Sequence, residues 1–494
     1  MNCLLACRGA EIGYDFTVPT VYSGSGPNIQ NEKIQFMNEE SDFSPSPSAG
    51  TISLGEAFWT WCRVAVFSFG GPAGQIAVMH RIIVDEKKWI TEERFLHALN
   101  YCMLLPGPEA QQLATYIGWL MHRTIGGLMA GILFVMPGFI SILALSIGYA
   151  CFQQTTIVAG LFFGLKPAVM AIVVGAVIRI GNRILKNKLM YVIAGTAFVA
   201  IFFFNIPFPL LIALAGLIGL LGGRIAPEQF RVLKEHGATG QTEFAIADKF
   251  PLVTIEPTWR RSLKICAIFL PLWFGPLALV GWFTGRDSVF TQEGIFFSQA
   301  AVVTFGGAYS VLAYIAQQAV ERFGWLQPGE MLDGMGMAET TPGPLIMVVQ
   351  FVGFMGAYRN PGSLNPLTAG VLGSIVTVWA TFVPCFFWIF LGAPFVERLR
   401  GNRTITAALS SITAAVVGVI LNLAVWFSLH TIFGTVETSS FGGIRLLIPV
   451  WSTLSYGSLV ICVIAFLLTF YWKRGMFLTL AVCGACGYSW YLSI

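Results

Sequence analysis

A duplicated motif divides this sequence into two halves. Each half carries Phe-Gly-Gly, then Trp, then Pro-Gly-Pro, and the two copies align without a gap. The motif residues are Phe69-Gly70-Gly71, Trp89 and Pro106-Gly107-Pro108 in the first half, and Phe305-Gly306-Gly307, Trp325 and Pro342-Gly343-Pro344 in the second. All three matches have one separation, 236 residues, which indicates an internal duplication.

The composition is that of a chain that crosses a lipid bilayer many times. Of its 494 residues, 55% are hydrophobic and only 11% are charged, whereas a soluble domain carries about 25% charged residues. The net charge of +4 comes without a basic cluster, so no nucleic-acid partner is expected. We therefore predict an all-α polytopic membrane protein.

No catalytic, metal or cofactor site is apparent in the sequence. There is no Gly-Lys-Ser/Thr phosphate loop, and the five histidines are dispersed. Cys483 and Cys486 have metal-like spacing, but they lie in an apolar segment without a second pair. Helix packing explains them better, so we expect neither an enzyme nor a bound metal or cofactor.

Apolar segments of about 20 residues predict about thirteen transmembrane spans. They run near 54–76, 97–121, 126–150, 156–178, 189–205, 207–222, 263–284, 294–318, 332–357, 366–392, 404–430, 446–470 and 474–492. The predicted units are a disordered polar tail over 1–50, a first repeat over 51–222, a cytoplasmic linker over 223–261, one odd connecting span over 262–285 and a second repeat over 290–494.

The arrangement of six spans, one span and six spans predicts that the repeats are inverted relative to each other. One odd span delivers the second copy to the opposite side of the membrane, as in many secondary transporters. Basic loops, including the one from Arg179 to Lys188, favour a cytoplasmic N-terminus in a cell membrane. The basic loop from Arg81 to Arg94 disagrees, which indicates either a re-entrant first span or a loop folded against the membrane.

The two Pro-Gly-Pro elements predict broken helices inside the membrane. Two prolines around a glycine remove amide donors and interrupt the helix. The residues after the second proline then start a half-helix, whose free N–H groups and positive dipole end favour an anion. Breaks at matching positions in both copies point to a binding site rather than to packing alone.

Charged residues within the spans are candidates for the same site. Lys166 is expected either to neutralise an anionic substrate or to pair with a carboxylate, and Arg63 is a weaker candidate. Glu109 follows the first Pro-Gly-Pro and Glu339 precedes the second, so each is expected either to carry protons or to bond a broken helix end. Arg179 and Arg183 read most simply as topology anchors.

The motifs together resemble the signature of the chromate ion transporter family. The resemblance rests on the segments 69–75, 105–114, 304–309 and 339–344, together with Trp89, and extends over about residues 52–492. It looks most like the long, two-domain members, in which the second copy lacks the Glu-Ala-Gln-Gln of the first. The resemblance implies a membrane protein that exports chromate and confers chromate resistance.

The expected ligand is chromate or a similar tetrahedral oxyanion, with protons as one candidate for a coupling ion and a homodimer as one option for the assembly. The predicted substrate-binding residues are Arg63, Gly70, Gly71, Pro106, Gly107, Pro108, Glu109, Gln111, Lys166, Gly306, Gly307, Glu339, Pro342, Gly343 and Pro344. Two alternatives stay open. One is an uptake transporter for sulfate or a related oxyanion, and the other is a channel for small anions.

Overall fold

The computed structural model describes residues 52–230, 258–395 and 403–493. The predicted tail over 1–50 and most of the predicted linker over 223–261 lie outside these residues. The description that follows concerns the described part of the chain between Thr51 and Ile494.

Within residues 52–230, the regular elements of the first half are all helices. Its elements are α1 (Leu54–Phe67), α2 (Gly71–His80), the π-helix η1 (Arg81–Glu86), α3 (Glu92–Cys102), α4 (Glu109–Phe152), α5 (Thr156–Ile184), α6 (Lys188–Phe202), α7 (Phe208–Ile225) and the single turn α8 (Pro227–Phe230). A connecting helix, α9 (Trp259–Thr284), leads to the second half.

The second half repeats this order of elements and adds a hairpin. It contains α10 (Val289–Val302), α11 (Ala308–Gln317), the π-helix η2 (Gln318–Arg322), α12 (Glu330–Thr340), η3 (Leu345–Met347), α13 (Val348–Arg359), α14 (Pro366–Gly392), η4 (Ala393–Phe395), α16 (Arg403–Ile432), β1 (Val436–Phe441), β2 (Ile444–Pro449), η5 (Trp451–Thr453), α17 (Tyr456–Phe466), the π-helix η6 (Leu467–Tyr471) and α18 (Met476–Ser493). The starts of α10, α11, η2, α12 and η3 follow those of α1, α2, η1, α3 and α4 by 235 to 238 residues.

Short polar caps begin the helices that surround the breaks. The hydroxyl of Ser53 accepts from the Glu56 amide before α1, at 3.1 Å. Ser288 caps α10 in the same way through the Thr291 amide, at 3.3 Å. Such caps satisfy N–H groups that a helix start leaves unpaired, and they fix where the apolar run becomes helical.

The prediction of an all-α polytopic membrane protein is confirmed. Within the described residues, seven helices are long and apolar enough to cross a bilayer, namely α4, α5, α7, α9, α14 with η4, α16 and α18. Three further apolar helices are shorter: α6, η3 with α13, and α17 with η6. The only sheet in this part of the chain is the antiparallel hairpin β1–β2, which turns at Gly442 and Gly443.

Several of the thirteen expected spans are not separate continuous helices, including the one near 332–357, which divides at the second Pro-Gly-Pro into α12 and η3 with α13. The segments near 54–76 and 294–318 are each divided into two short helices at the Phe-Gly-Gly motif. The segment near 97–121 continues from its break into α4, which also contains the segment near 126–150 and is kinked at His122 and Arg123. In addition, the expected span near 446–470 begins as strand β2 and becomes helical only at Tyr456.

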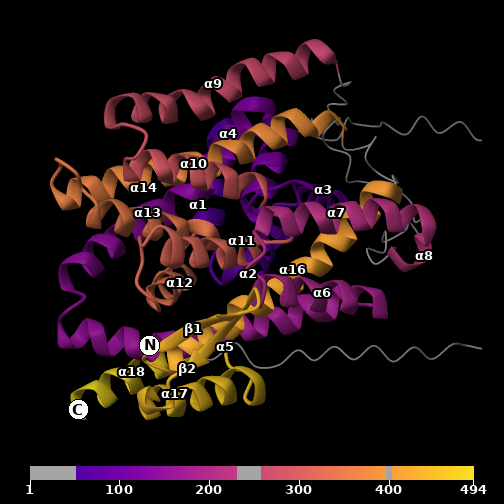
Figure 1. Cartoon of the computed structure of the whole chain (residues 1–494). Helices are drawn as coiled ribbons and strands as arrows, with labels where there is room; N and C mark the ends of the chain where they lie inside the picture. The colour runs from indigo at the N-terminus through magenta and orange to yellow at the C-terminus, as the bar shows by residue number, and fades with distance from the viewer. Residues whose placement is uncertain (1–51, 231–257, 396–402, 494) are drawn as a thin grey trace, which may run out of the picture. The chain divides into compact units, whose positions relative to one another are not determined.

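The two halves interlock through their later helices. Helix α5 packs against α17 and α18, while its counterpart α16 packs against α6 and α7. Helix α9 packs on α14 and α10 at the margin of the helices in Figure 1, and only Phe269 and Trp273 of α9 are buried. One continuous hydrophobic cluster joins α5 and α16 to α10–α14, so the broken helices of the second half are held inside the core.

Candidate functional site

The predicted breaks occur where the sequence places them. Helix α3 ends at Cys102 and α4 starts at Glu109, directly after the first Pro-Gly-Pro. Helix α12 ends at Thr340 and η3 starts at Leu345, directly after the second. Each half-helix therefore begins with N–H groups that have no partner within the helix, as an anion site requires.

The Phe-Gly-Gly motifs break two further helices, which differs from the continuous spans that we expected there. Gly71 has a φ of +69° and Gly307 a φ of +99°, a region that residues with a Cβ rarely adopt. Helices α2 and α11 start at or directly after these glycines. The apolar runs on both sides look continuous in the sequence, because glycine is common within membrane helices.

Backbone hydrogen bonds join the breaks of one half to the breaks of the other. The Gly107 amide donates to the Thr304 carbonyl at 2.8 Å, and the Gly343 amide donates to the Ser68 carbonyl at 2.9 Å. Each Pro-Gly-Pro thus meets the chain just before the Phe-Gly-Gly of the opposite copy. The four predicted motifs come together as two crossed pairs.

Polar side chains support the second Pro-Gly-Pro. Gln75, buried on α2, donates to the Gly343 carbonyl at 2.7 Å. Tyr309 donates to Glu339 at 2.6 Å, and both are buried. A Cβ at Gly71 would lie 3.8 Å from Glu339 Oε2. Glu339 therefore lies at the contact between α2, α11 and α12, where its carboxylate accepts from a side chain of α11 next to the Phe-Gly-Gly break.

Glutamines support the first Pro-Gly-Pro. The amide of Gln112 donates to the Pro106 carbonyl at 2.7 Å, and that of Gln111 donates to the Thr115 hydroxyl at 3.0 Å. Both glutamines are fully buried, yet their Oε1 atoms have no hydrogen-bond partner among the described residues. Buried polar atoms of this kind are uncommon in native structures and often mark functional sites.

Two arginines on α5 lie near the breaks, which the sequence analysis did not anticipate. Arg179 and Arg183 are one helical turn apart, so they lie on the same side of α5. The positive charge of Arg183 acts on the Glu109 carboxyl, and its Nη2 donates to Met103 Sδ at 3.9 Å. The charge of Arg179 acts on Glu339 and Tyr309.

These two arginines address equivalent positions of the duplication. Met103 is the aligned counterpart of Glu339, 236 residues earlier. Both arginine side chains are exposed, and no hydrogen bond or ion pair holds Arg179 within the described part of the chain. The only hint in the sequence is their four-residue spacing at the end of an apolar span.

Lys166 lies in an ion pair, the second of its two expected roles. Its Nζ is 3.5 Å from Asp333 Oδ2 on α12, and the Tyr149 hydroxyl donates to the same oxygen at 2.9 Å. Asp333 is buried, while the Lys166 side chain is 29% exposed. The three side chains join α4, α5 and α12 one turn into the helix that leads to the second Pro-Gly-Pro.

Arg63 is not brought to the breaks by its contacts. Its Nη1 lies 2.8 Å from Glu86 Oε2 on η1, and both side chains are substantially exposed. The pair lies beside a cluster of mixed charges, in which His80 contacts both Asp85 and Glu92. These contacts hold the disagreeing basic loop against α1 and α3.

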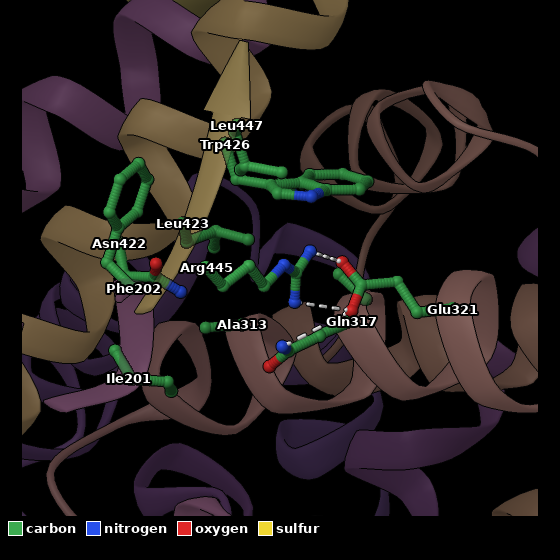
Figure 2. A pocket seen from close by; sticks show the side chains of 11 residues that line it. Ile201, Phe202, Ala313, Gln317, Glu321, Asn422, Leu423, Trp426, Arg445 and Leu447 are labelled. Carbon is green, nitrogen blue, oxygen red and sulfur yellow. Dashed lines mark hydrogen bonds and ion pairs between the residues drawn. The ribbon is translucent and has the colours of Figure 1, made fainter. Parts of the chain in front are cut away.

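A small cavity between α6 and elements of the second half contains a further arginine. The cavity of about 20 Å³ is lined from both halves of the chain, including Phe202 and Trp426. Figure 2 shows Arg445 of β2 reaching across it to Glu321 of η2, with two hydrogen bonds of 2.9 and 2.5 Å. Gln317 donates to Asn205 Oδ1 at 2.5 Å beside this pair.

No group of three or more His, Cys, Asp and Glu side chains is placed to hold a metal ion within residues 52–230, 258–395 and 403–493. The chemistry of the breaks is instead that of N–H donors, amides and guanidinium groups. This donor set suits an anion with several oxygen atoms.

Comparison with known proteins agrees with this architecture. The family model described as chromate transporter matches residues 55–220 and 292–488, one match in each half. No solved structure matches the chain. The family match leaves out α9 and the residues between the halves.

Several curated relatives cover most of the chain. The chromate transport protein of Cupriavidus metallidurans is 27% identical over 384 residues, which are 76% of this chain and 82% of the relative. The chromate transport protein of Pseudomonas aeruginosa is 28% identical over 398 residues, 80% of this chain and 85% of the relative. Since the family model matches both halves and the relatives cover them together, the chain is a multi-pass membrane protein that belongs to the chromate transporter family.

Proposed function

We propose that this protein is a secondary active transporter that exports chromate from the cytoplasm across the cell membrane and so confers chromate resistance. The observation that carries the proposal is the meeting of the two Pro-Gly-Pro breaks with the Phe-Gly-Gly breaks of the opposite copy, beside which Arg183 contacts Met103. Relatives named chromate transport proteins supply the substrate.

The donor set matches a tetrahedral dianion. Two guanidinium groups one turn apart present two positive charges and several fixed N–H donors. Half-helix starts at Glu109 and Leu345 add backbone N–H groups and positive dipole ends. An anion held between them would contact both copies of the duplication, so movement of one copy against the other would expose it to alternate sides.

The membrane potential favours export. A cell interior that is negative repels a dianion with about 2.3 kcal/mol per charge for each 100 mV. Proton exchange through Glu109 or Glu339 would add to this driving force, because each carboxyl lies beside one of the two Pro-Gly-Pro breaks. The proposed topology has a cytoplasmic N-terminus and two inverted repeats over 51–222 and 290–494.

The test is chromate uptake into inside-out vesicles, with sulfate as competitor. Arg179→Ala and Arg183→Ala are expected to raise the KM for chromate about tenfold or more, since a charge-assisted hydrogen bond contributes about 1.5–3 kcal/mol. Arg286→Ala removes one exposed positive charge just after α9 and serves as the matched control.

Two results would overturn different parts of the proposal, the first its site and the second its function. An unchanged KM in both arginine variants would move the site elsewhere and leave the exporter intact. No chromate flux in wild type, with saturable sulfate entry into right-side-out vesicles, would replace the exporter with an oxyanion uptake transporter.

A further inference from the structure

Glu293 on α10 is a buried carboxyl that neither the family signature nor the duplication accounts for. Its side chain is 0% exposed, and neither Oε1 nor Oε2 has a hydrogen-bond partner among the described residues. The aligned residue of the first half is Ala57. The carboxyl is therefore not needed to pack this helix in the repeat.

Two glycines form the space that holds this carboxyl. A Cβ at Gly356 of α13 would lie 2.9 Å from Glu293 Oε1, and a Cβ at Gly373 of α14 would lie 3.0 Å from Oε2. Any other residue at these positions would force the carboxyl to move. The pocket is thus shaped for the carboxyl by two different helices.

The surrounding charges do not neutralise Glu293. Helix α14 has no charged residue between Pro366 and Gly392, and α9 carries its charges at Arg260, Arg261 and Lys264, near its start. Helix α13 presents Tyr358 and Arg359, but the guanidinium of Arg359 is bonded twice to Glu330 at 2.7 Å and once to the Trp325 carbonyl at 2.9 Å. A carboxylate buried without a partner costs several kcal/mol, so this group must bind a proton or another small cation.

A polar face of α14 connects Glu293 with the first Pro-Gly-Pro. Gly373, Thr377, Thr381 and Cys385 recur at every fourth residue and so share one side of the helix. Twelve residues of helix span about 18 Å. At the far end, Cys385 Sγ lies 3.0 Å from the position of a Cβ at Gly107.

Unpaired polar atoms occur along this face. The hydroxyl of Thr377 and the Oε1 of Gln350 on α13 are fully buried and have no partner in the described part of the chain. Gln111 and Gln112 have the same property at the Pro-Gly-Pro end. Side chains one helical turn apart are about 5–6 Å from each other, so a proton would pass along this face through water molecules between the hydroxyl and amide groups.

We propose that Glu293 is a proton-binding site of the transport cycle. The carboxylate binds one proton to form the neutral acid, and it releases that proton along the polar face of α14 toward the first Pro-Gly-Pro. The inference rests on the proposed function, since it names the residue that carries the coupling proton.

Infrared spectroscopy tests proton binding without any substrate. Difference spectra between wild type and Glu293→Gln, recorded in lipid membranes across a pH titration, are expected to contain the carbonyl band of a protonated carboxyl that disappears as the pH rises. A band that is absent or does not titrate overturns the proposal. Loss of the band on adding Na⁺ at constant pH also overturns it, in favour of a sodium site.

Transport in proteoliposomes tests coupling. Glu293→Gln is expected to move at least tenfold fewer protons per chromate ion than wild type, measured with a trapped pH dye and radiolabelled chromate. Glu437→Gln removes an exposed carboxylate on β1 and should leave this ratio unchanged. A wild-type ratio in Glu293→Gln overturns the proposal, whereas absence of chromate flux in wild type overturns the proposed function and leaves the infrared result standing.

Thr377→Val keeps the test decisive if Glu293→Gln does not fold. This change removes the hydroxyl but preserves the shape of the side chain and the carboxyl of Glu293. Proton release after a pH jump, followed by the same infrared band, is expected to slow at least tenfold. Unchanged release would contradict the path along α14.

Discussion

The backbone amide of Gly107 donates a hydrogen bond of 2.8 Å to the carbonyl of Thr304. Gly343 lies 236 positions after Gly107, and Ser68 lies 236 positions before Thr304. The Gly343 amide donates to the Ser68 carbonyl at 2.9 Å, which is the same bond with the two copies exchanged. When residue i contacts j and the counterpart of j contacts the counterpart of i, a two-fold axis relates the two copies. We infer that a pseudo-two-fold axis passes between the two breaks.

This axis leads to a prediction of topology. If it lies in the membrane plane, the α5–α6 connection and the α16–α17 connection face opposite sides. We expect Ser440→Cys, in a background without native cysteines, to react with an impermeant maleimide in intact cells. Lys186→Cys should react only after permeabilisation, because its loop is basic. Labelling of both from one side would place the axis along the membrane normal.

The glycines of the breaks should differ in their tolerance of alanine. Gly343 has a φ of +104°, and its Cβ would lie 3.0 Å from the Gly138 backbone. Gly307 has a φ of +99° with nothing within 4 Å of its Cβ. A backbone conformation with positive φ costs about 1–3 kcal/mol in either variant, and Gly343→Ala adds a collision. We expect a lower melting temperature for Gly343→Ala than for Gly307→Ala, measured in detergent, and the opposite order would contradict the packing of the second break on α4.

Variants of the Lys166–Asp333 pair can separate the two expected roles of Lys166, substrate binding and pairing with a carboxylate. Lys166→Met leaves the buried Asp333 carboxylate without its cation, so we expect a loss of folded protein. Lys166→Met combined with Asp333→Asn should recover most of that loss, because no charge is left unpaired. Thermal melting of the single and double variants measures the recovery.

The KM for chromate, measured in the same double variant, tests whether Lys166 also binds the substrate. If Lys166 only joins the helices, the double variant should transport with a KM within about threefold of wild type. A tenfold rise in KM in a well-folded double variant would return Lys166 to the substrate site.

The sequence predicts the breaks well because they are local. Proline and glycine determine backbone geometry at their own positions, so the starts of α4 and η3 follow from Pro108 and Pro344. The Phe-Gly-Gly breaks were missed as helix ends, since a glycine in an apolar run is compatible with a continuous membrane helix. The turns at the Phe-Gly-Gly motifs are required by contacts across the fold, in which Gly107 and Gly343 bond to the residues just before those motifs.

The charged groups of the site are harder to predict because their partners are distant in the chain. Arg179 acts on Glu339, 160 residues later, and Arg183 contacts Met103, 80 residues earlier. A pair of arginines at the end of an apolar span has the appearance of a topology anchor. The sequence does give one indication of Glu293, because it is the only charged residue between Asp287 and Glu321.

The hairpin β1–β2 has no counterpart in the described part of the first half. We expect the ion pair between Arg445 of this hairpin and Glu321 to restrict access to the adjoining cavity. Arg445 on β2 is bonded twice to Glu321 on η2, with side-chain exposures of 16% and 29%. The adjoining cavity reaches Asn422 on α16. We expect Arg445→Ala to raise the rate at which a maleimide modifies Asn422→Cys about tenfold, in a background without native cysteines.

The matched control for this prediction is Arg474→Ala, which removes an exposed arginine between η6 and α18. It should leave the labelling rate unchanged. Glu321→Gln should behave like Arg445→Ala, because either change removes the charge pairing while the Arg445 amide still donates to the Phe203 carbonyl at 2.7 Å. If only Arg445→Ala raised the rate, loss of side-chain volume rather than loss of the ion pair would explain the opening, and the hairpin would not be held by charge.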